Sequence, residues 1–118
     1  MKTIQLLKEH RGGKNSTSFA GRKEGKLVRD TLKLDALDND CNKYSISIPE
    51  DTTSFNPSFY LGLFYDSIEK LTWESFISKY QFDLNNISEP LKSIISRNLE
   101  ECERKAKNEC NGLTGLDV

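Results

Sequence analysis

Apolar and polar residues alternate with two different periods along this chain, and each period predicts its own elements. Tyr44–Ile48 (YSISI) alternates at every residue, as a strand with one buried face does. The short apolar run Thr3–Lys8 (TIQLLK) predicts a strand before it, and Gln81–Leu84 predicts a third strand after it. We therefore expect a small sheet, with Pro49 ending its second strand.

A helical period follows the first strand. Residues 9–18 (EHRGGKNSTS) are rich in Gly, Asn, Ser and basic side chains, a composition that favours a surface loop. From about residue 19 to residue 34, apolar residues recur at helical spacing and predict an amphipathic helix with a buried stripe of Leu27, Val28 and Leu32. We expect basic residues on its other faces: Arg22, Lys23, Lys26 and Arg29. Residues 35–43 are acidic and predict a turn.

The sequence SFNPSFYLGLF (residues 54–64) predicts the start of the central helix. Asn56 suits the N-cap, and Pro57 suits the first helical position, where the missing N–H of proline costs nothing. Phe55 and Tyr60 then stand where a hydrophobic staple forms. The helix should continue to about residue 70, with Gly62 permitting a close approach to the sheet. Its expected buried stripe is Tyr60, Leu63, Phe64, Ile68 and Leu71.

Two further helices are predicted in the last third. Thr72 is placed to cap a short helix that ends near Lys79. A longer helix should run from about Ser88 to Asn108, with Pro90 tolerated in its first turn. The expected buried face of this helix is Leu91, Ile94, Ile95, Leu99 and Cys102. Residues 1–108 should form the domain, and residues 109–118 a disordered tail.

The order of these elements indicates an α/β fold, a small single domain in which helices pack on a sheet. If the first two strands are parallel, the loops Glu9–Ser18 and Pro49–Pro57 open at the same edge of the sheet. Sites in α/β proteins commonly lie at that edge, so function is sought there first.

Composition fits one folded domain in the cytoplasm. The chain has 118 residues, 36% hydrophobic and 30% charged, which is enough for one core but not for two. No apolar stretch is long enough to span a membrane, and the first residues lack the apolar block of a signal peptide. Three cysteines without metal-type spacing predict neither a disulfide framework nor a zinc site.

The net charge of −1 conceals a division along the chain. Residues 1–33 carry nine Lys/Arg against three Asp/Glu, whereas residues 34–89 carry three against ten. Basic residues of the first third are candidates for contact with nucleic-acid phosphates: Lys14, Arg22, Lys23, Lys26 and Arg29. Because the whole chain is slightly acidic and has no nucleic-acid reading motif, nucleic-acid binding is the alternative hypothesis. A third hypothesis is an inhibitory protein of a mobile element that occupies a partner's surface.

No motif in the sequence predicts catalysis. His10 has no Cys or Ser partner nearby in the sequence and is interpreted as a surface imidazole. Glu50 and Asp51 follow a strand, as a general base or a magnesium ligand would, but paired acids are commoner in turns. The glycines and lysine of residues 12–16 lack the spacing of a P-loop. We therefore expect no enzymatic activity, no cofactor and no metal.

The aromatic and thiol side chains fit a core better than a site. Four aromatic residues stand at helical spacing among leucines, which favours burial over base stacking: Phe59, Tyr60, Phe64 and Tyr65. Cys102 lies on an apolar stripe and is expected in the core, whereas Cys110 is expected at the surface.

Ser58 is the main candidate for regulation. It stands at the second position of the predicted central helix, where backbone N–H groups are unpaired and the helix dipole is positive. A phosphate added there would be held favourably, which makes Ser58 a candidate switch with Thr53 and Ser54 beside it. The competing interpretation is that Ser58 is an ordinary residue of a helix start, where serine is common.

Two blocks of the chain resemble a known family: SFAGRKEGKLVRD (residues 18–30) and YSISIPEDTTSFNPSFYLGLFYDSIEKL (residues 44–71). Together they resemble the bacterial STAS-like domains of unknown function, relatives of the anti-sigma factor antagonists, over about residues 1–100. In these domains an S-R-x-E-G-like helix start is followed by a strand, a short loop and a Ser-Phe pair that opens the next helix. The resemblance implies a STAS-like α/β fold and a non-catalytic, regulatory protein–protein interaction domain.

The resemblance also implies a phosphoserine switch. In the antagonists, a partner kinase phosphorylates a serine at the corresponding helix start, and the state of that serine decides which partner binds. By position this serine resembles Ser58, and Arg22 and Glu24 resemble residues of the family's first block. The antagonist pattern Asp-Ser-Ser-Gly is replaced by residues 56–59, which read Asn-Pro-Ser-Phe.

We expect two segments to dock on a protein partner such as a histidine-kinase-like ATPase: the loop of residues 12–18, and residues 54–59 with Ser54, Asn56, Ser58 and Phe59. Arg22 and Glu24 complete the expected site. The oligomeric state is left open.

Overall fold

The computed structural model describes residues 1–13 and 15–115, and side chains as far as residue 110. The strands are β1 (Lys2–Gln5), β2 (Ser18–Phe19), β3 (Tyr44–Ser47), β4 (Ser54–Phe55) and β5 (Tyr80–Phe82). The helices are the 3₁₀ turn η1 (Lys8–Arg11), α1 (Arg22–Leu32), α2 (Leu34–Asp38), α3 (Pro57–Leu71), α4 (Trp73–Lys79) and α5 (Leu91–Gly115). The fold is therefore α/β, as the sequence predicts.

The strands form two small parallel sheets. One sheet has the order β1-β3-β5, and the other pairs β2 with β4. In β3, Tyr44 and Ile46 are buried while Ser45 and Ser47 are half-buried, so the alternating pattern predicted this strand correctly. The other two predicted strands exist with different bounds: β1 ends at Gln5 and not at Lys8, because Lys8 begins η1, and β5 runs over Tyr80–Phe82 and not over Gln81–Leu84. The two-residue strands β2 and β4 were not predicted, because each is stabilised only by its pairing with the other.

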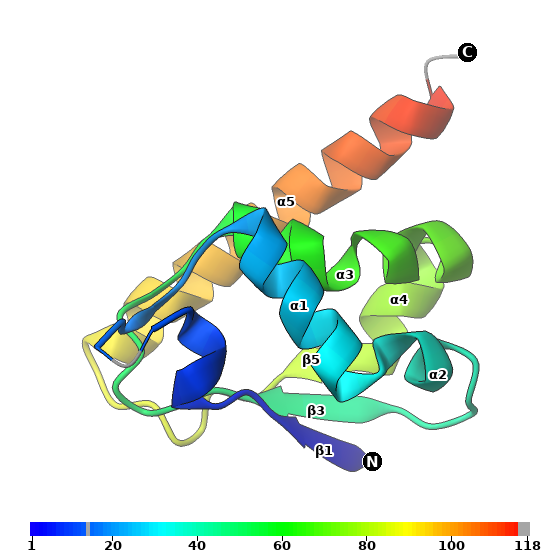
Figure 1. Ribbon diagram of the computed structural model, residues 1–118. Helices are drawn as coiled ribbons and strands as arrows, with labels where there is room; N and C mark the ends of the chain where they lie inside the picture. The colour runs from blue at the N-terminus through cyan, green and yellow to red at the C-terminus, as the bar shows by residue number, and fades with distance from the viewer. Residues whose placement is uncertain (14, 116–118) are drawn as a thin grey trace.

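Helices cover one side of the three-stranded sheet, with α3 in the middle (Figure 1). α3 begins at Pro57 as predicted, and its N-terminal staple is present, because the rings of Phe55 and Tyr60 lie 6.4 Å apart. Asn56 occupies the N-cap position, but its side chain makes no capping hydrogen bond. α3 packs against α1, α2, α4 and α5, which makes it the central helix of the fold.

The orientation of α1 differs from the prediction. The helix begins at Arg22 because Phe19 belongs to β2 and Gly21 has a left-handed φ of 95°. Leu27 is 58% exposed although it was expected in the buried stripe, whereas Arg29 is 3% exposed although it was expected at the surface. The helix is turned this way because its glycine and arginine, and not only its apolar residues, contact α3.

Glycines allow α1 and α3 to run side by side in close contact. A Cβ added to Gly62 would lie 2.1 Å from the backbone oxygen of Arg22, and one added to Gly25 would lie 2.2 Å from that of Phe59. Gly62 therefore approaches α1 and not the sheet, which corrects the prediction. Gly21 before α1 is bonded to Ser58 at the start of α3, and Arg29 further along α1 is bonded to Ser67 further along α3, so the two helices are parallel and their amino ends lie together.

Arg29 ties the carboxyl halves of this helix pair to α2, an arrangement we call the closed end. Its guanidinium donates to Leu63 O at 2.9 Å, Ser67 Oγ at 2.7 Å, Asp35 Oδ1 at 2.6 Å and Asp38 Oδ2 at 2.7 Å. Tyr80 OH donates to Asp38 Oδ1 at 2.7 Å. Burial opposes the charge of Arg29, but the hydrogen bonds to Asp38 and Asp35 raise its pKa above the usual value. The residues at the closed end are thus bound into one buried polar network.

α5 is longer than predicted. It continues to Gly115 instead of ending near Asn108, so residues 109–115 of the expected tail are helical, and residues 116–118 lie outside the described part. Its buried positions include Ile95, Cys102 and Ala106, and burial raises the pKa of the Cys102 thiol to about 12. None of the helices within the described ranges is both long and apolar enough to cross a lipid bilayer.

Candidate functional site

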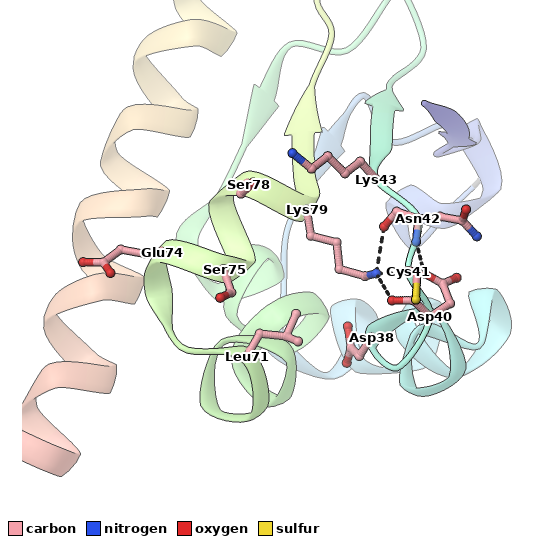
Figure 2. A pocket seen from close by; sticks show the side chains of 10 residues that line it. All are labelled: Asp38, Asp40, Cys41, Asn42, Lys43, Leu71, Glu74, Ser75, Ser78 and Lys79. Carbon is pink, nitrogen blue, oxygen red and sulfur yellow. Dashed lines mark hydrogen bonds and ion pairs between the residues drawn. The ribbon is translucent and has the colours of Figure 1, made fainter.

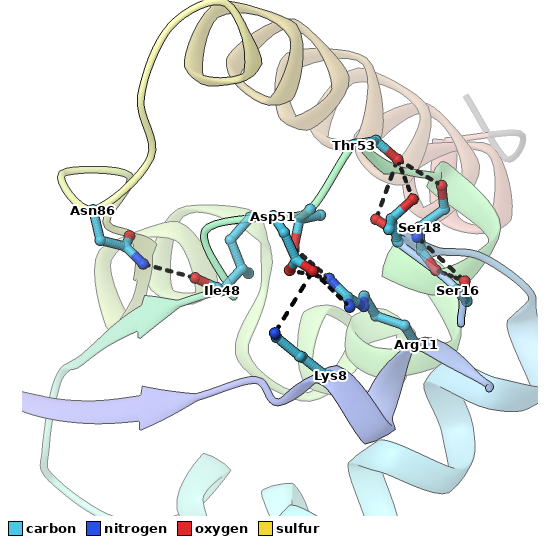
Figure 3. Close-up of polar contacts among 10 residues, drawn as sticks. Lys8, Arg11, Ser16, Ser18, Ile48, Asp51, Thr53 and Asn86 are labelled. Atoms are coloured by element: carbon cyan, nitrogen blue, oxygen red, sulfur yellow. Dashed lines mark hydrogen bonds and ion pairs between the residues drawn. The ribbon is translucent and has the colours of Figure 1, made fainter. Parts of the chain in front are cut away.

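The loops after β1 and β3 meet at one edge of the sheet, as the sequence predicts for parallel strands. An ion pair joins them: Arg11 Nη1 lies 2.7 Å from Asp51 Oδ1 (Figure 3). The side chain of Arg11 is 2% exposed and that of Asp51 is 45% exposed, so the arginine anchors the contact from inside. Arg11 Nη1 also donates to Thr52 Oγ1 at 3.3 Å, while its Nε is buried without a hydrogen-bond partner. The hydrogen bond from Arg11 lowers the pKa of Asp51.

Hydroxyl groups join the same two loops next to this ion pair. Thr17 and Thr53 hydroxyls lie 2.7 Å apart, and Ser54 Oγ donates to Ser18 Oγ at 2.6 Å. Thr53 N donates to Thr17 O at 2.8 Å, so backbone pairing and side-chain contacts reinforce each other. Segments more than thirty residues apart in the sequence therefore form one small surface.

The amino ends of α1 and α3 meet at Ser58, which we call the open end of the helix pair. The N–H of Gly21, the residue before α1, donates to Ser58 Oγ at 3.1 Å. Ser58 is exposed and occupies the second position of α3. Both helix dipoles place their positive ends here, so a negative charge on Ser58 is favoured by two helices.

Ser58 and the paired loops together form what we call the junction surface: residues 12, 13, 15–18, 53, 54, 56 and 58. The structure brings together three of the predicted site residues, with Ser58 exposed and Ser54 and Asn56 half-buried. Phe59 does not belong to this surface. It is completely buried and packs its ring against Phe19 and Phe55, so it stabilises the site from below and cannot contact a partner.

Arg22 and Glu24 lie beside the junction surface, and the side chain of Arg22 contacts residues outside it. Arg22 Nη1 lies 3.2 Å from Glu109 Oε1, and its guanidinium stands over the ring of Tyr65 at 5.2 Å. Arg22 therefore ties the start of α1 to α5. Glu24 is half-buried beside Gly21 and Gly12, where a Cβ on Gly21 would lie 2.5 Å from Glu24 Oε2.

His10 and Asp51 are engaged in contacts within the chain. His10 Nδ1 accepts a hydrogen bond from Leu7 N at 2.9 Å, which closes the η1 turn. Asp51 pairs with Arg11, and its neighbour Glu50 is exposed.

Within the described part of the chain, no group of three or more His, Cys, Asp or Glu side chains is placed to hold a metal ion.

The predicted nucleic-acid face loses one of its members. Arg29 is buried at the closed end, where α2 and α3 supply its hydrogen-bond acceptors, so it cannot contact a phosphate outside the molecule. Lys23 and Lys26 are exposed on α1, while Lys14 lies outside the described residues. Arg29 is thus removed from the predicted face, while Arg22, Lys23 and Lys26 are exposed on α1, so nucleic-acid binding remains a prediction.

A hollow of about 460 Å³ lies at the opposite edge of the sheet (Figure 2). Its wall includes Lys79, whose ammonium group donates to Asp40 O at 2.9 Å, Asp40 Oδ1 at 2.8 Å and Asn42 O at 2.8 Å. The hydrogen bond from Lys79, followed by that from Tyr44, lowers the pKa of Asp40 well below its usual value. Because an ammonium group has three protons, Lys79 is fully engaged in holding the loop of residues 40–42.

Arg11 and Lys79 were not recognised from the sequence. Their acceptors lie about forty residues away in the chain, at Asp51 for Arg11 and at Asp40 for Lys79. No short motif or helical period signals such a partner, so only the fold reveals the two contacts.

Comparison of the chain with protein-family models, with curated proteins and with solved structures found no match. The STAS-like resemblance therefore remains a prediction that depends on the two sequence blocks.

Proposed function

We propose that this chain is a STAS-like regulatory interaction domain of the cytoplasm that binds a protein partner through the junction surface. The observation that carries the proposal is the position of Ser58. Its hydroxyl is exposed where the amino ends of α1 and α3 meet, and it already accepts a hydrogen bond from Gly21 N. An exposed hydroxyl in this position can be modified without opening the core.

Phosphorylation of Ser58 is the proposed switch. A kinase partner transfers the γ-phosphoryl group of ATP to Ser58 Oγ, with release of ADP and of the hydroxyl proton. The phosphate adds about 1.5 to 2 negative charges at pH 7. Two helix amino ends favour this charge, each by about 0.3–1 kcal/mol, so the modified domain remains folded while its surface charge changes.

The paired loops support the same proposal by giving the switch a fixed surface around it. The Arg11–Asp51 ion pair and the contacts between residues 17–18 and 53–54 hold the loops beside Ser58. A partner that docks there contacts Ser58 and both loops together. The resemblance to the anti-sigma factor antagonists supports a kinase, such as a histidine-kinase-like ATPase, as one such partner.

The test compares Ser58→Ala and Ser58→Glu with the same pair of substitutions at Ser78, an exposed serine on α4. The purified proteins are incubated with ATP and an extract of the native host cells, and the phosphorylated residues are mapped by mass spectrometry. We expect phosphate on the wild type and on Ser78→Ala but not on Ser58→Ala.

Binding gives a second, independent readout. A partner captured by the wild type should lose at least about tenfold in affinity for Ser58→Glu, equivalent to 1.4 kcal/mol, and bind Ser78→Glu normally. If every captured partner binds Ser58→Glu like the wild type, and no phosphate is found on Ser58, the proposed function is wrong.

A further inference from the structure

Strand β1 forms the outer border of its sheet (Figure 1). Its partner on one side is β3, and in the described residues no strand pairs with its other side. Lys2, Thr3 and Gln5 are exposed, so this side of the strand is open to solvent.

The backbone groups on the open side belong to Thr3 and Gln5. Lys2 N donates to Lys43 O and Leu6 N donates to Ser47 O, both at 2.9 Å. Since the groups of alternate residues in a strand point to opposite sides, the N–H and C=O of Thr3 and Gln5 point away from β3. They are four hydrogen-bonding groups in the spacing that an added strand requires.

Charge and shape along this border favour one kind of occupant. Lys2 and Lys43 lie at one end and Lys8 at the other; the side chain of Lys8 is 67% exposed, and its Nζ lies 3.7 Å from Asp51 Oδ2 in an exposed ion pair. Thr3 and Gln5 between these ends are uncharged. Near the Lys8 end, Leu7 is 43% exposed, in the wall of a hollow of about 260 Å³ that extends over the end of β3 to Ser47, Pro49 and Asn86.

We propose that β1 accepts an extended, acidic segment of a protein partner as an additional strand. The backbone of that segment pairs with Thr3 and Gln5, its acidic side chains face the lysines at the two ends, and an apolar side chain contacts Leu7. A second copy of the chain fits less well. Antiparallel pairing of two β1 strands brings Lys2 near Lys8, parallel pairing brings Lys2 beside Lys2, and both arrangements place like charges together.

This interface lies apart from the junction surface and does not depend on the proposed phosphorylation. It would give the domain a second contact that Ser58 variants leave unchanged.

The test uses Thr3→Pro, which removes an outward N–H but no N–H directed at β3, and proline is tolerated on a strand edge for this reason. Thr3→Val keeps the N–H and is the matched control. Short random peptides are selected by display on the full-length wild type. We expect the selected peptides to be rich in Asp and Glu around β-branched residues, and to lose at least about tenfold in affinity for Thr3→Pro but not for Thr3→Val.

Thermal melting first establishes that Thr3→Pro is folded. The variant Lys2→Glu, which changes an exposed side chain at the other end of the border from Asp51, provides the same test without altering the backbone, and it should weaken the acidic peptides at least about tenfold. Peptides that bind both variants like the wild type would overturn the proposal. So would wild-type self-association that Thr3→Pro abolishes, since the occupant would then be a second copy.

Discussion

At the closed end of the α1–α3 pair, the guanidinium of Arg29 donates to three side chains and one backbone oxygen, and it is 3% exposed. At the open end, 3.1 Å separates Gly21 N from the exposed hydroxyl of Ser58, in a hydrogen bond that links the two helix starts. The glycine contact between Gly25 and Gly62 lies between these ends. One helix pair thus combines a buried, fully bonded end with an exposed, lightly bonded one.

The difference shows where this fold can tolerate modification. A buried cation that loses its partner destabilises the whole domain, because the remaining charge has no solvent to replace that partner. An exposed hydroxyl can gain or lose a group at small cost, because water replaces the lost hydrogen bond. The open end is therefore the better place for a regulated contact, and the following variants test the contrast.

Asp38→Ala should cause the largest loss in the free energy of unfolding. Asp38 is fully buried and accepts hydrogen bonds from Arg29, Ser67 and Tyr80, so its removal deprives three buried donors of their acceptor and leaves Arg29 with Asp35, which is 77% exposed. We expect a loss of about 3–5 kcal/mol in the free energy of unfolding, measured with urea. The double variant Arg29→Met/Asp38→Leu should be more stable than Asp38→Ala, because it removes both charges. A loss below about 1 kcal/mol in Asp38→Ala would contradict the importance given to the closed end.

Gly62→Ala should cause the second-largest loss of stability, because its new methyl group would meet a backbone oxygen and not a flexible side chain. We expect a loss of about 1–3 kcal/mol, although alanine favours helices. The displacement should also shift the amide NMR signal of Gly21. Gly13→Ala is the control, since nothing lies within 4 Å of a Cβ at Gly13, and its stability should be unchanged or slightly higher. Equal stability of the two variants would argue against close helix contact.

Asp51→Asn should have a smaller effect of about 1 kcal/mol at pH 7, because asparagine keeps an oxygen that can accept from the buried guanidinium of Arg11, and Asp51 itself is half-exposed. The pKa of Asp51 is lowered in the folded state, so its contribution is present above the unfolded pKa of about 3.9 and is lost as pH falls through the folded value. The stability difference between wild type and Asp51→Asn should therefore shrink below about pH 4 in acid unfolding curves. Glu50→Gln, at an exposed neighbour, should change stability by less than about 0.5 kcal/mol at pH 7.

Ser58→Ala should have the smallest effect on folding, below about 0.5 kcal/mol, because its hydrogen bond is exposed. The melting temperature should match that of the wild type. A strongly destabilised Ser58→Ala would show that the open end supports the fold, and the contrast between the two ends would then disappear.

Much of the fold could be predicted because it depends on residues that are close together in the sequence. The alternation from Tyr44 to Ser47 and the Asn56-Pro57 helix start are local patterns, and both match the structure. The prediction also placed the two loops at one edge, since parallel strands leave no other choice. Within the site, it found the exposed Ser58 but included the buried Phe59, because a helix start and a helix interior are only one residue apart there.

The sequence by itself determined that residues 44–47 are extended and where the central helix begins, because caps, staples and periodicity act over a few residues; it did not determine β2, β4 or α2, which lies where a turn was expected. Only the tertiary structure decided that Leu27 faces solvent while Arg29 is buried, that Gly62 meets α1, and that Arg11 joins Asp51. The physical reason is that burial of a charge or a close backbone contact is favourable only when a distant segment supplies the matching acceptor or space. That information is not contained in any local stretch of the chain.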